Sequence, residues 1–191
     1  FTLQYRGPHG PERPPSGYPG LGAAPGPPMA TAPGYIAGRG LLPRYQFQPD
    51  ARGRNDYVTR YQSSAGWALD EVDRLLTLAS QKGFLRDTIV VFTSDHGEYL
   101  GEQDFWFQHG VHLDPAVVHV PLVIARSVAE PLTRDVRVVS HLDVLPTLLA
   151  LRRTPAEGLP GVDLFARPGP RRVPILTENI AFPDSAEVGV V

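Results

Sequence analysis

The sequence predicts an α/β fold, with a mostly parallel central sheet flanked by helices, and two neighbouring segments carry this prediction. Between Val58 and Ala79, apolar residues recur at gaps of three and four, which places them on one face of a helix. The run from Thr88 to Thr93 is β-branched and aromatic and is apolar on both faces, as in a buried parallel strand. Because open α/β sheets bind ligands at the carboxyl ends of their strands, we expect functional residues directly after Thr93.

The helix is expected to begin at Asn55 or Asp56, because both side chains are suited to capping a first turn. It is expected to end near Gly83, where Lys82 and Gly83 resemble a C-terminal cap. Its apolar face consists of Val58, Tyr61, Ala65, Ala68, Leu69, Val72, Leu75, Leu76 and Ala79. The sequence therefore predicts one long amphipathic helix.

Three further elements are predicted after the strand. Residues 117–125 form a second apolar run, which predicts a strand entered through Pro121. Ser140 with Asp143 three places later resembles a capping box, and a short helix is expected behind it at 144–151. A linker rich in proline, glycine and arginine occupies 152–172, and residues 173–178 are expected to form a last strand at an edge.

The first part of the chain is predicted to be a long loop over residues 8–54. Pro8 to Pro33 contains nine of the 21 prolines and five glycines, which removes backbone donors and prevents regular structure. The middle of this segment, Gly22 to Pro28, is expected to be disordered, with its ends held in place. Because the chain begins with Phe1 in a strand-like alternation, we expect that it lacks the start of its domain.

Composition and charge exclude several classes of protein. The chain has 191 residues, 42% of them hydrophobic, so it is long enough to bury a core. Its 18 basic and 20 acidic residues give a net charge of -2, so no nucleic-acid partner is expected. No apolar run approaches the roughly 18 to 20 residues of a membrane span. With zero Cys the chain has no disulfide, no cysteine-ligated zinc and no cysteine nucleophile, and the compartment stays undetermined.

Histidines and carboxylates gather between residues 95 and 119. They are His96, His109, His112 and His119, interleaved with Asp95, Glu98, Glu102, Asp104 and Asp114. Imidazole and carboxylate together suit a divalent cation, and Asp95 and His96 are the best placed pair because they follow the strand directly. The structural alternative is that Asp95 caps the next turn while His96 is a partly buried, hydrogen-bonded side chain.

The remaining polar residues of this region differ in what they predict. His109 lies beside Trp106 and Phe107, which favours a shaped, partly buried site over a plain turn. Glu98 is expected on a solvated turn, with a weaker alternative as the partner of a metal ligand. Ser94 lacks the flanking glycines of a nucleophile elbow and is excluded as a nucleophile. A structural role is expected for His112, Asp114, His119, Ser140 and Asp143.

Five motifs, in order along the chain, resemble the sulfatase family of the alkaline-phosphatase-like superfamily. The central one is a strand ending in Ser94-Asp95-His96-Gly97, preceded by a helix that carries Tyr61, Ser64 and Asp70. The others are Pro8-His9-Gly10-Pro11, Phe107-Gln108-His109-Gly110, Val120-Pro121-Leu122, and Asp143-Val144-Leu145-Pro146-Thr147 followed by Gly161 to Leu164. The resemblance covers about residues 1–165. It implies the C-terminal portion of a catalytic domain with a partial alkaline-phosphatase-like sandwich, and it leaves residues 166–191 as linker and final strand.

The resemblance implies roles for four residues. Asp95 and His96 match two ligands of the family's divalent metal, usually Ca²⁺ in sulfatases and often Mn²⁺ or Zn²⁺ in related phosphonate and phosphodiester hydrolases. His109 matches the basic residue that contacts the ester's charged oxygens and helps the leaving group. His9 matches a histidine of the substrate crevice that also binds the ester; without the resemblance, an exposed loop position is the simpler interpretation of His9.

The sequence departs from the family's pattern at two places. The family's nucleophile is a formylglycine made from a Cys-x-Pro-x-Arg or Ser-x-Pro-x-Arg segment, and these 191 residues contain neither. The Asp-Asp metal pair that the family carries near the start of its domain is also absent. We therefore expect formylglycine and the remaining ligands in a missing N-terminal half, and we do not expect this chain alone to turn over substrate.

Three functions are compatible with these observations. The first is part of a metal-dependent hydrolase that cleaves small-molecule or saccharide sulfate esters. The second keeps the fold but acts on phosphorus, as a phosphonate monoester or phosphodiester hydrolase or a phosphoethanolamine-type transferase. The third is a metal-binding or interaction module without catalysis. The sequence does not distinguish the first two, and it does not determine the oligomeric state.

Overall fold

The computed structural model describes residues 9–11, 13–19, 24–110, 112–126, 131 and 133–166, and the backbone of two strands at 176–179 and 187–190. The chain divides into two compact units, Phe1–Pro131 and Leu132–Val191. The strand-like start at residues 1–5 and residues 20–23 of the predicted loop lie outside the described part. The division into a portion at 1–165 and a linker at 166–191 stays a prediction.

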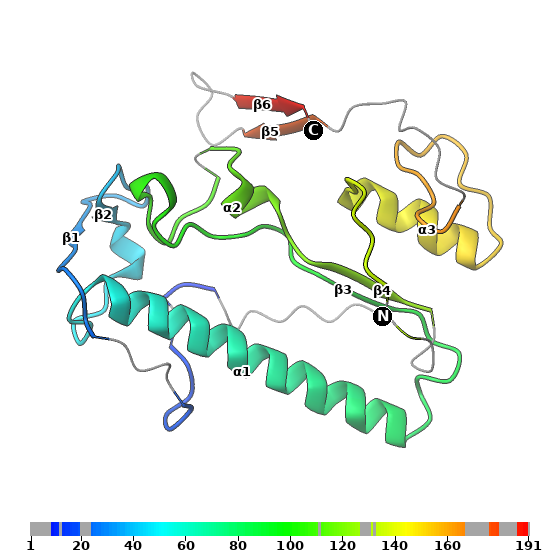
Figure 1. The fold of residues 1–191 in the computed structure, drawn as a ribbon, viewed down its shortest axis with the longest axis horizontal. Coiled ribbons are helices and arrows are strands. Elements are labelled where there is room, and N and C mark those ends of the chain that lie inside the picture. Colours follow the sequence, from blue (N-terminus) through cyan, green and yellow to red (C-terminus); the bar gives the residue numbers. More distant parts are fainter. Residues whose placement is uncertain are drawn as a thin grey trace. The chain divides into compact units, whose positions relative to one another are not determined.

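The long helix is confirmed as α1, which spans Arg54–Gln81 without interruption (Figure 1). Its C-terminal cap forms where it was predicted, because Gly83 adopts a φ of 77° that favours glycine. The N–H of Gly83 donates to the carbonyl of Ser80 at 2.9 Å, and the N–H of Phe84 donates to that of Ala79 at 2.9 Å. These two bonds make a Schellman motif and satisfy carbonyls that the end of a helix leaves unpaired.

The start of α1 differs from the prediction, because the N-cap is Gly53 and no side chain of the described residues caps it. Instead, Arg54 N donates to the carbonyl of Pro27 and Asn55 N to that of Pro25, each at 2.9 Å. A Cβ on Gly53 would lie 2.4 Å from the oxygen of Pro25, so the close approach of the loop requires glycine here. The predicted disorder is therefore wrong for this part of the loop, whose carbonyls cap the helix.

The predicted strand after the helix is confirmed as β3, Val90–Thr93. Its partner is β4, Leu122–Ala125, which runs beside it in the antiparallel direction with Val91 opposite Ile124 (Figure 1). All three sheets in the described part of the chain have two strands. The α/β character is thus present, whereas the predicted mostly parallel central sheet is not confirmed.

The second apolar run is a strand only in its last four residues. Its beginning lies in a short helix, α2, Pro115–Val118, and the prediction of a strand there is wrong. The side chain of Asp114 accepts a hydrogen bond from Ala116 N at 3.1 Å, and Pro115 occupies the first helical position, where its missing N–H costs little. His119 ends this helix and is exposed, so it does not lie in a strand.

The predicted loop at 8–54 contains short elements that the sequence did not indicate. A parallel pair joins β1, Ala30–Thr31, to β2, Leu41–Leu42, and a 3-10 turn follows at Arg44–Gln46. Leu42 packs with Tyr57 of α1 and Phe107 in a buried cluster. A second cluster consists of Tyr99, Phe105 and Val117. Both clusters include residues of the segment 97–110, so the core fixes the loop that carries the predicted site.

The apolar face of α1 is covered only in part. Val58 and Tyr61 near its start are partly buried, whereas Leu69 and Leu75 are 56% and 43% exposed. In the described residues, no helix has the length and apolarity that crossing a membrane needs.

The second unit contains the predicted short helix as α3, Val144–Leu151, preceded by a 3-10 turn at His141–Asp143. The predicted capping box between Ser140 and Asp143 is present. Two terminal strands, β5 at Leu176–Asn179 and β6 at Glu187–Val190, pair in the antiparallel direction. The strand predicted at 173–178 is confirmed from Leu176, and its first residues lie outside the described part.

Asp143 is expected to determine the stability of the second unit. Its carboxylate is fully buried and accepts from Ser140 N at 2.8 Å and from Val162 N at 2.9 Å. Asp143→Ala leaves both donors without this partner, so we expect a loss of about 2–4 kcal/mol in the free energy of unfolding. Denaturant unfolding of the full-length protein measures it. Asp163→Ala is the matched control, because its bond to Phe165 N lies at the surface, and an equal loss in both variants would contradict this account.

Candidate functional site

The site lies on a loop that leaves β3 and folds back on itself. Leu100 and Trp106 pair as an antiparallel bridge, and Phe107 N donates to the carbonyl of Tyr99 at 2.7 Å. Tyr99 N donates in return to the carbonyl of Gln108 at 3.2 Å. The two flanks of the loop are therefore held side by side, which brings residues 95–98 close to residue 109.

Gly97 holds the turn after β3 against α2. Its N–H donates to the carbonyl of Val117 at 2.7 Å, and a Cβ at this position would lie 2.1 Å from the carbonyl oxygen of Ala116. Real Cβ atoms do not approach backbone that closely, so only glycine fits. The sequence suggests that Gly97 serves a backbone bend, but the structure shows close approach of a second segment as the reason for glycine.

Asp95 presents one oxygen to the backbone and the other toward His96. Its Oδ1 accepts from His96 N at 3.1 Å and from the Ser94 hydroxyl at 3.4 Å. Partial burial acts to raise the pKa of Asp95, but the charge of His96 and these hydrogen bonds outweigh it, so the pKa is lowered. The side chain is 77% exposed and stays ionised, as a cation ligand requires.

His96 is oriented by its own backbone. Its Nδ1 lies 2.8 Å from the carbonyl oxygen of Gly97, and because a carbonyl can only accept, Nδ1 carries the proton. When the ring is neutral, the other nitrogen, Nε2, carries the lone pair, and it lies 3.9 Å from Oδ2 of Asp95. A fixed Nδ1–H with a free Nε2 is the arrangement in which histidine commonly binds metals.

His109 is paired with Glu98 across the loop. Its Nδ1 lies 3.3 Å from Oε2 of Glu98, whose side chain is only 11% exposed. The hydrogen bond and charge of Glu98 raise the pKa of His109 above its ordinary value, although partial burial opposes this. The expectation that Glu98 lies on a solvated turn is wrong.

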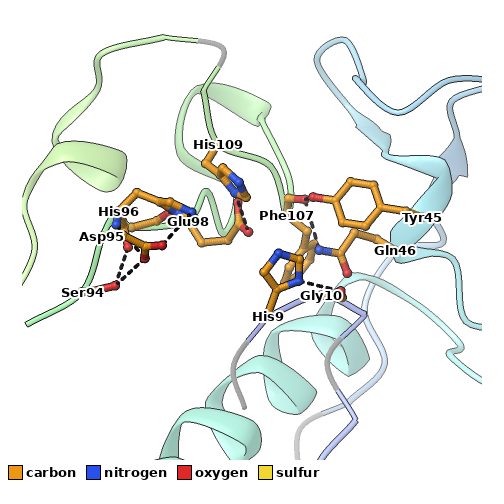
Figure 2. Close-up of polar contacts among 11 residues, drawn as sticks. His9, Gly10, Tyr45, Gln46, Ser94, Asp95, His96, Glu98, Phe107 and His109 are labelled. Carbon is orange, nitrogen blue, oxygen red and sulfur yellow. Dashed lines mark hydrogen bonds and ion pairs between the residues drawn. The ribbon is translucent and has the colours of Figure 1, made fainter. Parts of the chain in front are cut away.

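The imidazoles of His96 and His109 stack face to face. Their ring centroids are 3.7 Å apart with an angle of 24° between the planes, and Figure 2 shows the two rings side by side with Glu98 below His109. The structure therefore brings three of the four predicted site residues together: Asp95, His96 and His109.

His9 lies on the other flank of the site. It is exposed, and its Nδ1 contacts the carbonyl of Gly10 at 3.0 Å. Among the described residues, none of Asp95, His96 and His109 forms a hydrogen bond or ion pair with it. The connection is indirect, since a Cβ on Gly10 would meet the side chain of Gln46, and Gln46 donates to the carbonyl of Phe107 at 3.3 Å (Figure 2).

Two polar residues of the predicted loop support the site and were not singled out from the sequence. The hydroxyl of Tyr45 donates to the carbonyl of Phe107 at 3.0 Å, beside the bond from Gln46. Both residues lie eight or nine positions before α1, in a segment without a recognisable motif, so no local pattern identified them. Ser94, which the sequence excludes as a nucleophile, donates to the carbonyl of His96 at 2.7 Å.

The Sulfatase family model matches residues 1–152. The chain belongs to the sulfatase family. Its fold class at the family level is thus the alkaline-phosphatase-like α/β fold, of which the described residues show helices and small sheets.

Several curated proteins resemble this sulfatase-family chain. The low-salt glycan biosynthesis sulfotransferase Agl7 of Haloferax volcanii is 32% identical over 133 residues, which cover 64% of this chain and 32% of that protein. A choline-sulfatase of Rhizobium meliloti is 33% identical over 91 residues, covering 48% of this chain and 17% of the relative. An arylsulfatase K of Bos taurus is 35% identical over 86 residues, covering 44% and 16%. The chain thus spans less than a third of each relative, and no solved structure matches it.

The donor set at Asp95 and His96 fits part of a divalent cation site. One carboxylate oxygen and one imidazole nitrogen face each other at 3.9 Å, and both keep lone pairs available. Within the described ranges, no group of three or more His, Asp or Glu side chains is placed to hold an ion. The described residues therefore offer two candidate ligands, fewer than such a cation takes.

Proposed function

We propose that the full-length protein hydrolyses sulfate esters and that Asp95 and His96 hold its divalent cation. The observation that carries this proposal is that Oδ2 of Asp95 and Nε2 of His96 lie 3.9 Å apart, with the ring of His96 stacked on that of His109. Ca²⁺ is the ion expected from the resemblance to the sulfatase family, and Mn²⁺ and Zn²⁺, which suit an imidazole ligand better, are the alternatives. The other ligands would come from residues outside this chain.

The cation, His109 and His9 are each proposed to act on a different part of the ester. A bound cation would neutralise negative charge on the ester oxygens as the transition state forms. His109 is proposed to place its Nε2 at the bridging oxygen of the leaving group, since Glu98 occupies its Nδ1. His9 is proposed to bind a peripheral ester oxygen from the exposed flank of the site.

The attacking group is proposed to be a formylglycine outside residues 1–191, because the chain has no Cys and no Ser-x-Pro-x-Arg segment. This chain would then supply half of the ligands and the groups that assist the leaving group. We accordingly propose that residues 1–191 alone are inactive and become active only in the full-length protein.

Small-molecule or saccharide sulfate esters are the proposed substrates. The names of the relatives favour sulfur over phosphorus, since they include a choline-sulfatase, an arylsulfatase and a glycan sulfotransferase. The sulfotransferase adds one alternative, transfer of the sulfuryl group to an acceptor in place of water. Phosphonate monoesters and phosphodiesters, and a module without catalysis, remain the other outcomes of the test.

Turnover of two chromogenic esters by the full-length protein tests the proposal. We expect release of 4-nitrophenol from 4-nitrophenyl sulfate, loss of this activity on chelation, and its return with Ca²⁺ or Mn²⁺. Faster turnover of bis(4-nitrophenyl) phosphate would assign the protein to the phosphorus branch. Acceleration of 4-nitrophenol release by added sugar, with sulfated sugar as product, would indicate transfer. No turnover of either ester with any of the three metals would contradict catalysis.

A further inference from the structure

We propose that Glu98 is the positioning residue of the site, which holds the imidazole of His109 so that Nε2 faces the ester. The expected effect of Glu98 on catalysis rests on the proposed function. The orientation and tautomer of the His109 ring can be tested without it. Glu98 is a residue that the sequence placed on a solvated turn.

The contact between the two side chains is shielded from solvent. Oε2 of Glu98 lies 3.3 Å from Nδ1 of His109, and the Glu98 and His109 side chains are 11% and 28% exposed. The antiparallel bridge between Leu100 and Trp106 fixes the backbone on both sides of the pair. The geometry is therefore built into the loop, unlike that of a surface ion pair between long mobile side chains.

The chemistry of a carboxylate decides which nitrogen of His109 it engages. An ionised carboxylate only accepts, so Nδ1 carries a proton whenever the contact is made. The ring has just one other nitrogen, Nε2, which forms no hydrogen bond with any residue in the described part of the chain. The face of the ring is held as well, since it stacks on His96 at 3.7 Å. Glu98 and His96 together leave Nε2 as the one polar atom of the ring that can reach a substrate.

The second oxygen of Glu98 shows that packing alone does not explain this residue. Oε1 is buried and has no hydrogen-bond partner among the described residues. Leaving a buried acceptor of a charged group unpaired lowers the stability of the fold. A glutamate at this position is therefore better explained by a functional role than by packing. Holding the imidazole in one tautomer and one orientation is a purpose that needs a carboxylate or an amide oxygen at this point.

The first test is kinetic and uses the full-length protein with two aryl sulfates. Phenyl sulfate has a more basic leaving oxygen than 4-nitrophenyl sulfate, so it depends more on a proton from Nε2. In displacement by the proposed formylglycine hydroxyl, a new sulfur–oxygen bond forms as the bond to the leaving oxygen breaks. The electron pair of the broken bond stays on the leaving oxygen, which takes the Nε2 proton of the His109 imidazolium, and the neutral ring keeps Nδ1–H on Glu98. We expect Glu98→Ala to lower kcat about 10–100-fold with phenyl sulfate and clearly less with 4-nitrophenyl sulfate, with little change in KM. Glu98→Gln keeps an acceptor oxygen and should restore part of the rate.

A double-mutant cycle separates positioning from a general structural effect. In a His109→Gln background, Glu98→Ala should lower kcat no further, because its effect passes through the ring. Glu157→Gln, an exposed glutamate of the second unit, is the matched control and should leave both substrates unaffected. Equal losses with both sulfates, or a further loss in the His109→Gln background, would overturn the inference.

The second test needs no activity. In full-length protein labelled with ¹⁵N-histidine, NMR at a pH where the ring is neutral should show His109 protonated at Nδ1, and Glu98→Ala should abolish this preference. His109 protonated only at Nε2 in the unsubstituted protein would overturn the inference. If the esters are not hydrolysed but the Nδ1 tautomer is found, the proposed function fails while the positioning by Glu98 stands.

Discussion

Replacing Asp95 with asparagine is expected to lower both the metal content and the activity of the full-length protein. Asp95 offers a free carboxylate oxygen 3.9 Å from Nε2 of His96, and the amide of asparagine keeps the shape while removing the charge. Removing a group that only supports a metal ligand already lowers metal affinity or activity about 10–100-fold. For a direct ligand we expect a loss of about 100-fold or more in metal affinity and activity.

Elemental analysis and a Ca²⁺ titration measure the effect of this substitution. Asp87→Asn makes the same chemical change at an exposed position just before β3 and serves as control. We expect the control to bind metal normally, and excess Ca²⁺ to restore part of the activity of Asp95→Asn. An unchanged metal stoichiometry and affinity in Asp95→Asn would show that Asp95 is not a ligand and that its carboxylate only caps the turn through His96 N.

Replacing His109 is expected to lower the rate of the chemical step far more than metal binding. General acid–base groups contribute about 10²–10⁴-fold, and we expect a loss of kcat in this range for His109→Ala. The metal affinity should change little, because the proposed contact of His109 is the ester oxygen. His109→Gln is the companion variant, since alanine leaves the buried carboxylate of Glu98 without its partner.

The matched control for His109 is His119→Ala. His119 is an exposed imidazole at the end of α2, and its removal should leave kcat unchanged. Stopped-flow release of 4-nitrophenol gives kcat, and a parallel titration gives metal affinity. Equal losses of rate and of metal affinity in both His109 variants would argue that His109 is a ligand or a structural residue instead.

The elements predicted well are those whose signals are local. α1 was predictable because nine apolar positions share one face and because Gly83 terminates the helix with a positive φ. α3 was predictable because Ser140 and Asp143 form a capping box directly before an apolar segment. In each case a few neighbouring residues determine the backbone, so the sequence contains the needed information.

The errors in the fold arise from contacts between distant segments. Apolarity on both faces of β3 predicted a parallel strand, but its partner β4 is antiparallel, and strand direction depends on the chain between them. The start of the second apolar run is helical because Asp114 and Pro115 begin a helical turn. The apolar residues after Pro115 favoured a strand and outweighed this signal in the prediction. The loop at 24–28 is held by the N–H groups of α1, which the local composition did not indicate.

The candidate site was predictable in its residue types and less so in its pairings. Asp95 and His96 are adjacent in the sequence, so their proximity follows directly. The contact between Glu98 and His109 depends on the pairing of Leu100 with Trp106, and no sequence pattern gives that register. His9 was proposed from the resemblance alone, and among the described residues its link to the others passes through Gly10 and Gln46.

The central claim is that Asp95 and His96 bind one divalent cation, and pulsed EPR tests it most directly. In full-length protein loaded with Mn²⁺, electron spin echo modulation should show the nitrogen coupling of a directly bound imidazole. The coupling should disappear in His96→Ala and persist in His109→Ala, because His109 is proposed to face the ester. A nitrogen coupling that survives in His96→Ala would contradict the assignment, as would bound Mn²⁺ without any nitrogen coupling in the unsubstituted protein.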